Sequence, residues 1–212
     1  MNTLIKKFFK PLTFLLCLSI IFSTVIFSNA YTTNNDTLTY NEFYHTVRTA
    51  FSEHGKELIM EYDENHIYTS QDVAYMLDFL ENDKIKVVAT EVKHVPTVYR
   101  LMPSAFNYSH YFTVSSSQTY ISYATFELIV KGTIDLQGNN VMGIDSNQIV
   151  FRSGINYSSN TLSATCTRDK SIVRVKITGS VLFSYTEPNT GLNFSVNEPV
   201  TYYVNFDAGK YI

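Results

Sequence analysis

The spacing of hydrophobic positions changes once along the chain, near residue 84. Before that point, apolar side chains recur every three or four residues, which is the period of an amphipathic helix. After it they alternate with polar side chains, as in a β-strand with one buried face. The pattern therefore predicts a helical part over 39–83 and a strand-rich part over 84–212.

Two helices are predicted in the first part. Thr39 with Glu42 forms a capping-box pattern where the first helix begins. Thr69 with Asp72 repeats the spacing at the second. Gly55 interrupts the first helix and is expected to kink or divide it. The apolar positions expected to face the core are Phe43, Val47, Ala50, Phe51, Leu58 and Tyr62, followed by Val73, Met76, Leu77 and Leu80.

Alternation in the second part predicts a series of strands. A first strand runs from Lys84 to Val95 and ends at Pro96, whereas residues 96–118 are expected to be less regular. The stretch 119–136 alternates for long enough to need a bend, which we place at Gly132. Its predicted buried face contains Ala124, Phe126, Leu128, Val130, Ile134 and Leu136.

The last sixty residues predict a β-meander. A two-residue turn at 169–170 places Cys166 opposite Val173, and stepping outward puts apolar residues on one face. A second turn, at 186–191, buries the same face of the strand between the two turns. A slip of one residue would place polar side chains there instead. Because the two turns agree, the pattern fixes which face is buried.

The meander is expected to extend in both directions. The second turn places Tyr185 opposite Leu192, and a preceding strand over 149–157 would add Phe151 and Ile155 to the buried layer. The other face is polar, so only one side of the sheet needs a cover. We therefore predict an α+β domain in which two N-terminal helices pack on one face of a curved antiparallel β-meander sheet. A β-sandwich with appended helices is the alternative.

The N-terminus predicts export. Lys6, Lys7 and Lys10 precede an almost wholly apolar run over 12–27, and small residues stand before Ala30. We expect a signal peptide over 1–30 that is cleaved after Ala30, a flexible lead-in over 31–38 and one domain over 39–212. The alternative is a membrane anchor that is not cleaved. The predicted location is the extracellular space or the cell surface.

Charge restricts the class of partner. After the predicted cleavage, 13 basic residues remain against 19 acidic ones, a net charge of −6. This charge argues against nucleic acid as a partner. The helical part holds most of the excess acid, so it can attract the mildly basic strand part or a cationic partner.

Few residues suggest chemistry. Motifs of hydrolases, zinc proteases and nucleotide-binding loops are missing, and the five histidines lack metal-ligand spacing, so no cofactor and no metal site are predicted. The register places Cys166 on the buried face, where a thiol is inert. It also places Glu198 on that face, opposite Gly179, where a carboxyl of raised pKa could act as acid or base. A bulge before Pro199 that turns Glu198 to water is the favoured interpretation.

A stretch rich in tyrosine and serine, residues 106–123, has the composition of adaptable binding loops. Coverage of the core end is the favoured interpretation, and ligand binding is the alternative. The weak binding candidates are Tyr108, His110, Tyr111, Tyr123 and Glu198. The sequence thus favours an exported, non-catalytic binding or interaction protein of the bacterial cell envelope or extracellular space, with an unknown protein or glycan as partner. The alternative is a small pocket-bearing domain of the helix-on-curved-sheet type with ligand-binding or hydrolase activity.

Overall fold

The computed structural model describes residues 36–94, 104–116, 122–135 and 137–212. The predicted signal peptide with its cleavage point, most of the lead-in, Pro96 and Leu136 lie outside the described residues. The elements in chain order are α2 (Tyr40–Glu53), β1 (Glu57–Ile59), α3 (Ser70–Asn82), β2 (Ile85–His94), β3 (Ser104–Ser116), β4 (Tyr123–Asp135), β5 (Asn140–Ile155), β6 (Tyr157–Asn160), β7 (Ser163–Asp169), β8 (Ile172–Thr186), β9 (Asn193–Asp207) and the 3₁₀ turn η1 (Ala208–Lys210).

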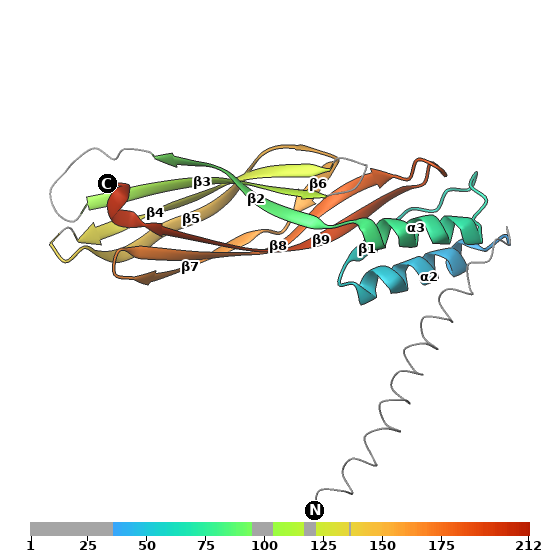
Figure 1. Ribbon diagram of the computed structural model, residues 1–212, viewed down its shortest axis with the longest axis horizontal. Coiled ribbons are helices and arrows are strands. Elements are labelled where there is room, and N and C mark those ends of the chain that lie inside the picture. The colour runs from blue at the N-terminus through green and yellow to red at the C-terminus, as the bar shows by residue number, and fades with distance from the viewer. Residues whose placement is uncertain (1–35, 95–103, 117–121, 136) are drawn as a thin grey trace, which may run out of the picture.

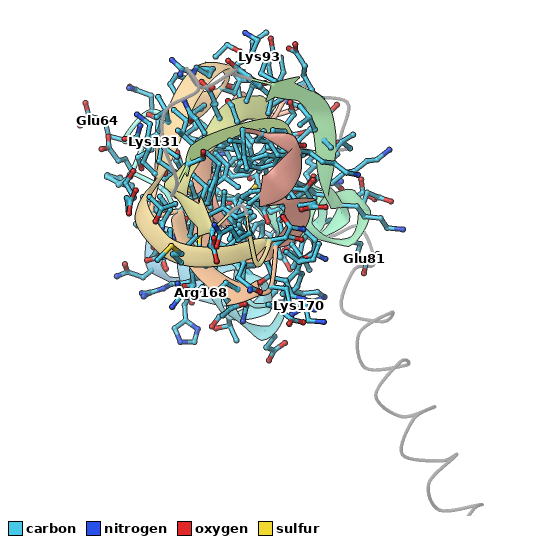
Figure 2. All side chains as sticks on the ribbon, turned by 90° about the vertical axis from the view of Figure 1, so that its left-hand side faces the viewer. Glu64, Glu81, Lys93, Lys131, Arg168 and Lys170 are labelled. Carbon is cyan, nitrogen blue, oxygen red and sulfur yellow. The ribbon has the colours of Figure 1, made fainter. Side chains whose placement is uncertain are left out.

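The strands form two antiparallel sheets around one core. A five-stranded sheet has the order β1-β9-β8-β6, with β7 also paired to β8, and a four-stranded sheet has the order β2-β3-β4-β5. Figure 1 shows α2 and α3 together at one end of an elongated molecule, with the C-terminus at the other end. Seen from that other end, the strands curl around a filled interior (Figure 2). The predicted α+β class, with two helices packed on a curved antiparallel sheet, is confirmed.

Both helices begin as predicted. Thr39 and Thr69 are N-caps, and each forms a complete capping box with the acidic residue three positions later. The first helix is shorter than its apolar pattern suggests, because Gly55 adopts a positive φ of 71° just after the His54 C-cap. Residue 58 lies on β1 instead, and Tyr62 is 62% exposed. The expectation that the apolar stripe continues to residue 62 is therefore wrong.

Aromatic side chains join the helices to the inner face of the five-stranded sheet. Phe51 of α2 and Phe79 of α3 lie with ring centroids 6.3 Å apart. The Phe79 ring also contacts Tyr185 at 4.8 Å and Phe194 at 5.1 Å, both edge to face. These contacts bury the helical stripes against β8 and β9, and burying one such aromatic side chain contributes about 1.5–3 kcal/mol.

The predicted buried faces are correct, although both predicted turns are displaced. Cys166 pairs with Val175 rather than Val173, and Tyr185 pairs with Phe194 rather than Leu192. Each register differs from the prediction by two residues, which leaves every side chain on its predicted face. The first turn falls at 170–171. Lys170 takes a positive φ of 53°, which two-residue hairpin turns require at their first position.

Two strand predictions need correction. Residues 104–116 form the regular strand β3, because its inward positions alternate even though several of them are polar. The strand expected over 149–157 ends at Ile155 and pairs with β4 in the four-stranded sheet. Phe151 and Ile155 are 41% and 48% exposed, so they do not join the meander layer. Asn156, with a φ of 54°, lies where the chain passes from β5 to β6 and so to the other sheet.

Candidate functional site

The five weak binding candidates are spread over three strands and do not form one site. Tyr108 and His110 point inward from β3 and are 2% and 4% exposed. Tyr111 points outward from the same strand, and Tyr123 is the half-buried first residue of β4. Glu198 points inward from β9 and is fully buried. The expectation that residues 96–118 are less regular is wrong for their β3 part, because Ser104–Ser116 forms a regular strand.

The inward-facing Tyr108 and His110 belong to an aromatic cluster between the sheets. The Tyr108 ring stacks on Phe206 with 3.7 Å between centroids and meets Tyr211 edge to face at 5.0 Å. His110 Nε2 lies 3.0 Å from Tyr202 Oη, and its Nδ1 has no partner among the described residues. Burial lowers the pKa of His110, because it disfavours the charged form of the ring. Core packing explains both side chains.

Tyr111 belongs to a polar cluster on the outer face of the four-stranded sheet. The Glu127 carboxylate accepts hydrogen bonds from Ser109 Oγ and Arg152 Nη2. Burial works against ionisation there, but these bonds and one with Tyr111 outweigh it and lower the pKa of Glu127. Lys93 lies over the Tyr111 ring, 5.0 Å from its centroid. The Glu127 carboxylate is paired with Arg152 and Lys93 lies against Tyr111, so the cluster stabilises the sheet surface and its one carboxylate is already paired.

Cys166 is half-buried on β7. Burial raises the pKa of its thiol, and a hydrogen bond with Asn147 only partly offsets this. A thiol of raised pKa is largely protonated near neutral pH and reacts poorly as a nucleophile.

The sequence did not predict the most unusual arrangement, a buried cluster of Lys56, Asp83 and Glu198. Lys56 Nζ lies 3.1 Å from Asp83 Oδ2 and 3.0 Å from Glu198 Oε1. The lysine side chain is 11% exposed, and the two carboxyl side chains are 0% and 1% exposed. Burial and the neighbouring Asp83 carboxylate raise the pKa of Glu198 to about 7, although Lys56 acts in the opposite direction.

Four elements supply this buried charge cluster. Lys56 precedes β1, Asp83 is the C-cap of α3, and Glu198 lies on β9. Ser116, at the end of β3, donates a hydrogen bond to Asp83 Oδ1. The cluster therefore joins the helices to both sheets at one point. The predicted register brings Glu198 to the inner face, but no local pattern indicates that Lys56 and Asp83 meet it from so far along the chain.

Glu198 also corrects a specific expectation. It pairs with Val181, and the β8–β9 register continues through Pro199 without a shift. No bulge turns its side chain to water, so the favoured interpretation was wrong. The carboxyl is tolerated inside because Lys56 supplies an opposite charge. Its Oε2 has no hydrogen-bond partner among the described residues, and the same holds for Tyr185 Oη and Ser122 Oγ.

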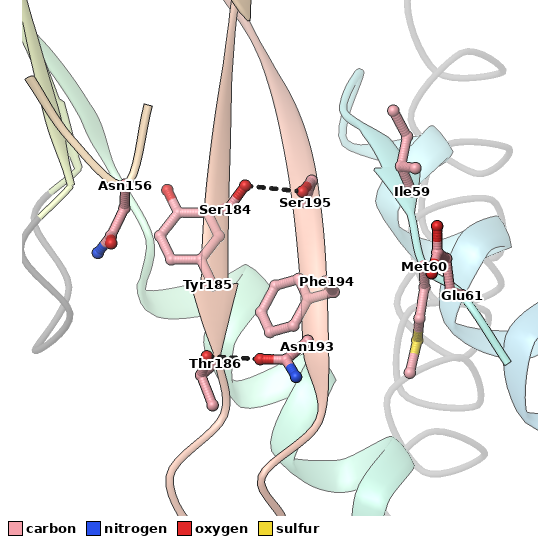
Figure 3. Close-up of a pocket in the computed structure, with 10 residues that line it drawn as sticks. All are labelled: Ile59, Met60, Glu61, Asn156, Ser184, Tyr185, Thr186, Asn193, Phe194 and Ser195. Carbon is pink, nitrogen blue, oxygen red and sulfur yellow. Dashed lines mark hydrogen bonds between the residues drawn. The ribbon is translucent and has the colours of Figure 1, made fainter. Parts of the chain in front are cut away.

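A groove of about 450 Å³ lies on the surface beside this cluster. It crosses the outer face of β8 and β9 between Asn156 and the chain at 59–61 (Figure 3). Ser184 and Ser195 are joined there by a 3.0 Å hydrogen bond, and Thr186 donates one of 2.6 Å to Asn193. Hydroxyl and amide side chains line part of the groove, and Ile59, Met60, Tyr185 and Phe194 line another part. Such a surface can hydrogen-bond a neutral polar ligand.

Comparison with known proteins gives no further guide to function, because no family model, curated protein or solved structure matches this chain. Within the described residues, no group of three or more His, Cys, Asp or Glu side chains could hold a metal ion. No helix in that same part of the chain has both the length and the apolar character needed to cross a membrane.

Proposed function

We propose that this chain is an exported, non-catalytic binding or interaction protein of the bacterial cell envelope or extracellular space. The groove on β8 and β9 is its candidate binding surface. The partner is a protein or a glycan that presents neutral hydrogen-bonding groups. The observation that carries this proposal is the lining of the groove, in which paired hydroxyl and amide groups are open to the surface.

The ionisable residues favour binding over hydrolysis. A general acid or base must reach the substrate within hydrogen-bonding distance. Glu198 has the raised pKa that such a group needs, but it is fully buried and paired with Lys56. His110 is also buried, between the two sheets. Glu61 is the one ionisable side chain among the groove residues apart from the buried Tyr185. A pocket-bearing hydrolase with its site in this groove would therefore lack an accessible acid–base pair among the groove residues.

Two matched substitutions on β9 test the groove. Ser195 lines the groove, whereas Thr201 points from the same outer face at a distance from it. Purified wild type would first be screened on a glycan array and by pull-down from its native surroundings. We expect Ser195→Phe to lose the captured ligand and Thr201→Phe to keep it, with equal thermal unfolding. Equal binding by both variants would place the binding surface elsewhere.

A separate screen addresses catalysis. The wild-type chain is assayed for hydrolysis of peptides, esters and glycans, together with Glu198→Gln and His110→Gln. We expect no turnover above the buffer control. Robust turnover that disappears in either variant would overturn the non-catalytic assignment.

A further inference from the structure

We propose that Lys56 and Asp83 are joined by a self-formed amide bond, with Glu198 as the group that carries the protons. The inference starts from the geometry of the buried charge cluster. A primary amine lies 3.1 Å from one carboxyl oxygen, and a second carboxyl lies 3.0 Å from the same nitrogen. Amine, acid and proton carrier are the three parts that an amide condensation needs.

Burial provides the driving force. Two carboxylates and an ammonium are held away from water, and each buried charge carries a desolvation cost that pairing only partly recovers. Condensation of Lys56 with Asp83 replaces one ammonium and one carboxylate by a neutral amide. The cluster is almost sealed, so bulk water has little access for hydrolysis once the amide has formed. The environment that makes the ion pair costly therefore favours the amide.

Proximity lowers the kinetic barrier to condensation. Reacting groups held in one orientation reach effective molarities on the order of 10⁵–10⁸ M. Lys56 is held just before β1 and Asp83 at the end of α3, so their side chains meet without a conformational search. The fold thus acts as the template for its own cross-link.

The step balances without any further reactant. Glu198 accepts one proton from the Lys56 ammonium and passes it to Asp83 Oδ2, which leaves a neutral amine and a neutral carboxylic acid. The amine nitrogen attacks Cγ of Asp83 and forms the C–N bond. Glu198 then carries a second proton from the nitrogen to Oδ2, the C–Oδ2 bond breaks, and that oxygen leaves as water. Glu198 ends in the state in which it began.

Each neighbouring group suits its part in this step. Glu198 interacts with both Lys56 and Asp83, and its pKa near 7 lets it take up and release a proton near neutral pH. Ser116 Oγ donates to Asp83 Oδ1, the oxygen on which negative charge develops when nitrogen attacks. Oδ2, which faces Lys56, is the oxygen that leaves. This distribution assigns Asp83 as the acceptor and Glu198 as the catalytic residue.

The cross-link would close a ring between two residues 27 positions apart that contains β1 and α3. Such a ring restricts the unfolded chain in the way that a disulfide does. Cys166 is a free thiol in the described part of the chain, so the amide would supply a covalent constraint that cysteine does not.

The test is mass spectrometry of the full purified chain under denaturing and reducing conditions. We expect the intact mass to be lower by one water molecule than the mass calculated from the sequence between the N-terminal and C-terminal residues of the purified chain. Tryptic digestion should give a branched peptide in which Lys56 resists cleavage and is linked to Asp83. A wild-type chain of full calculated mass with no branched peptide would overturn the proposal. A branch at Glu198 would overturn the assigned roles.

Variants separate the roles further. Asp83→Ala and Lys56→Arg should restore the full mass, because each removes one of the atoms that form the bond. Glu198→Gln should also keep the full mass while the chain stays folded by circular dichroism, since it retains polarity but carries no proton. Lys86→Arg, on the exposed side of β2, is the matched control and should still lose one water. Loss of water from Glu198→Gln would show that Glu198 is not the proton carrier. The wild-type result decides the existence of the bond even if a variant fails to fold.

Discussion

Tyr40 Oη donates a hydrogen bond to the main-chain carbonyl of Met60 over 3.0 Å, from α2 to the chain just past β1. Tyr44, one turn later, donates in the same way to the carbonyl of Leu58 at 3.4 Å. β1 is the edge strand of the five-stranded sheet. An edge strand with free carbonyl groups invites pairing with another chain. The two tyrosines close this edge with side chains instead of a further strand.

Tyr40→Phe tests that closure. The variant keeps the ring contacts but leaves a part-buried carbonyl without its donor. We expect the free energy of unfolding to fall by about 1 kcal/mol in chemical denaturation. Tyr203→Phe, on the exposed outer face of β9, is the matched control and should change stability little. Equal effects for the two variants would show that the edge contact contributes nothing of its own.

Lys56→Met tests how much the buried charge cluster contributes. The substitution keeps the length of the side chain but removes the amine that lies between the two buried carboxyls. We expect a loss of about 3–5 kcal/mol in the free energy of unfolding. Arg174→Met breaks the exposed pair with Asp169 and should cost below about 1 kcal/mol. Similar losses from both would contradict a special role for the buried cluster.

His110 should make stability depend on pH. Its pKa is lowered by burial, so below its ordinary value of 6.5 the unfolded chain binds a proton that the folded chain does not. Stability is therefore lost as the pH falls below 6.5. The difference in unfolding free energy between wild type and His110→Gln isolates this effect, because the other ionisable groups are shared. We expect the wild type to lose stability relative to His110→Gln as the pH falls from about 6.5 to 5. His45→Gln, exposed on α2, is the matched control for the loss of an imidazole at the surface.

Gly132 should not accept a side chain. A Cβ there would lie 2.7 Å from Phe106 Cζ and would also meet the main-chain carbonyl of Gly143. Gly132→Ala should therefore cost about 1–3 kcal/mol through overpacking. Gly143→Ala is the matched comparison, since its nearest contact is Thr133 Oγ1 at an ordinary 3.6 Å. Thermal unfolding of both variants measures the difference, and equal melting temperatures would contradict the close approach.

Most of the fold could be predicted from the alternation of apolar and polar residues, because every second side chain is apolar in a strand with one buried face. The alternation predicts three buried side chains whose exposed fractions are 1% for Val175, 0% for Phe183 and 6% for Val204. The turns could be placed only to within two residues, since a shift of two keeps every side chain on its face. Lys170 takes a positive φ in the first turn. The alternation of apolar and polar residues does not show at which residue such a turn lies.

The candidate site was less accessible to sequence reasoning. Glu198 stood out because a carboxyl on an apolar face is costly. Its partners Lys56 and Asp83 lie 142 and about 115 residues away along the chain, and only the packing of α3 and β1 against β9 brings them together. The polar groove has the same origin, because its residues come from β8, β9, the end of β1 and the β5–β6 junction. No local pattern marks either site.

The helices and both sheets meet at the buried charge cluster. A crystal structure of the purified chain at high resolution tests this directly. We predict Lys56 enclosed between Asp83 and Glu198, with continuous electron density from Nζ of Lys56 to Cγ of Asp83. A lysine side chain turned out to solvent, with Glu198 exposed on its strand, would contradict it.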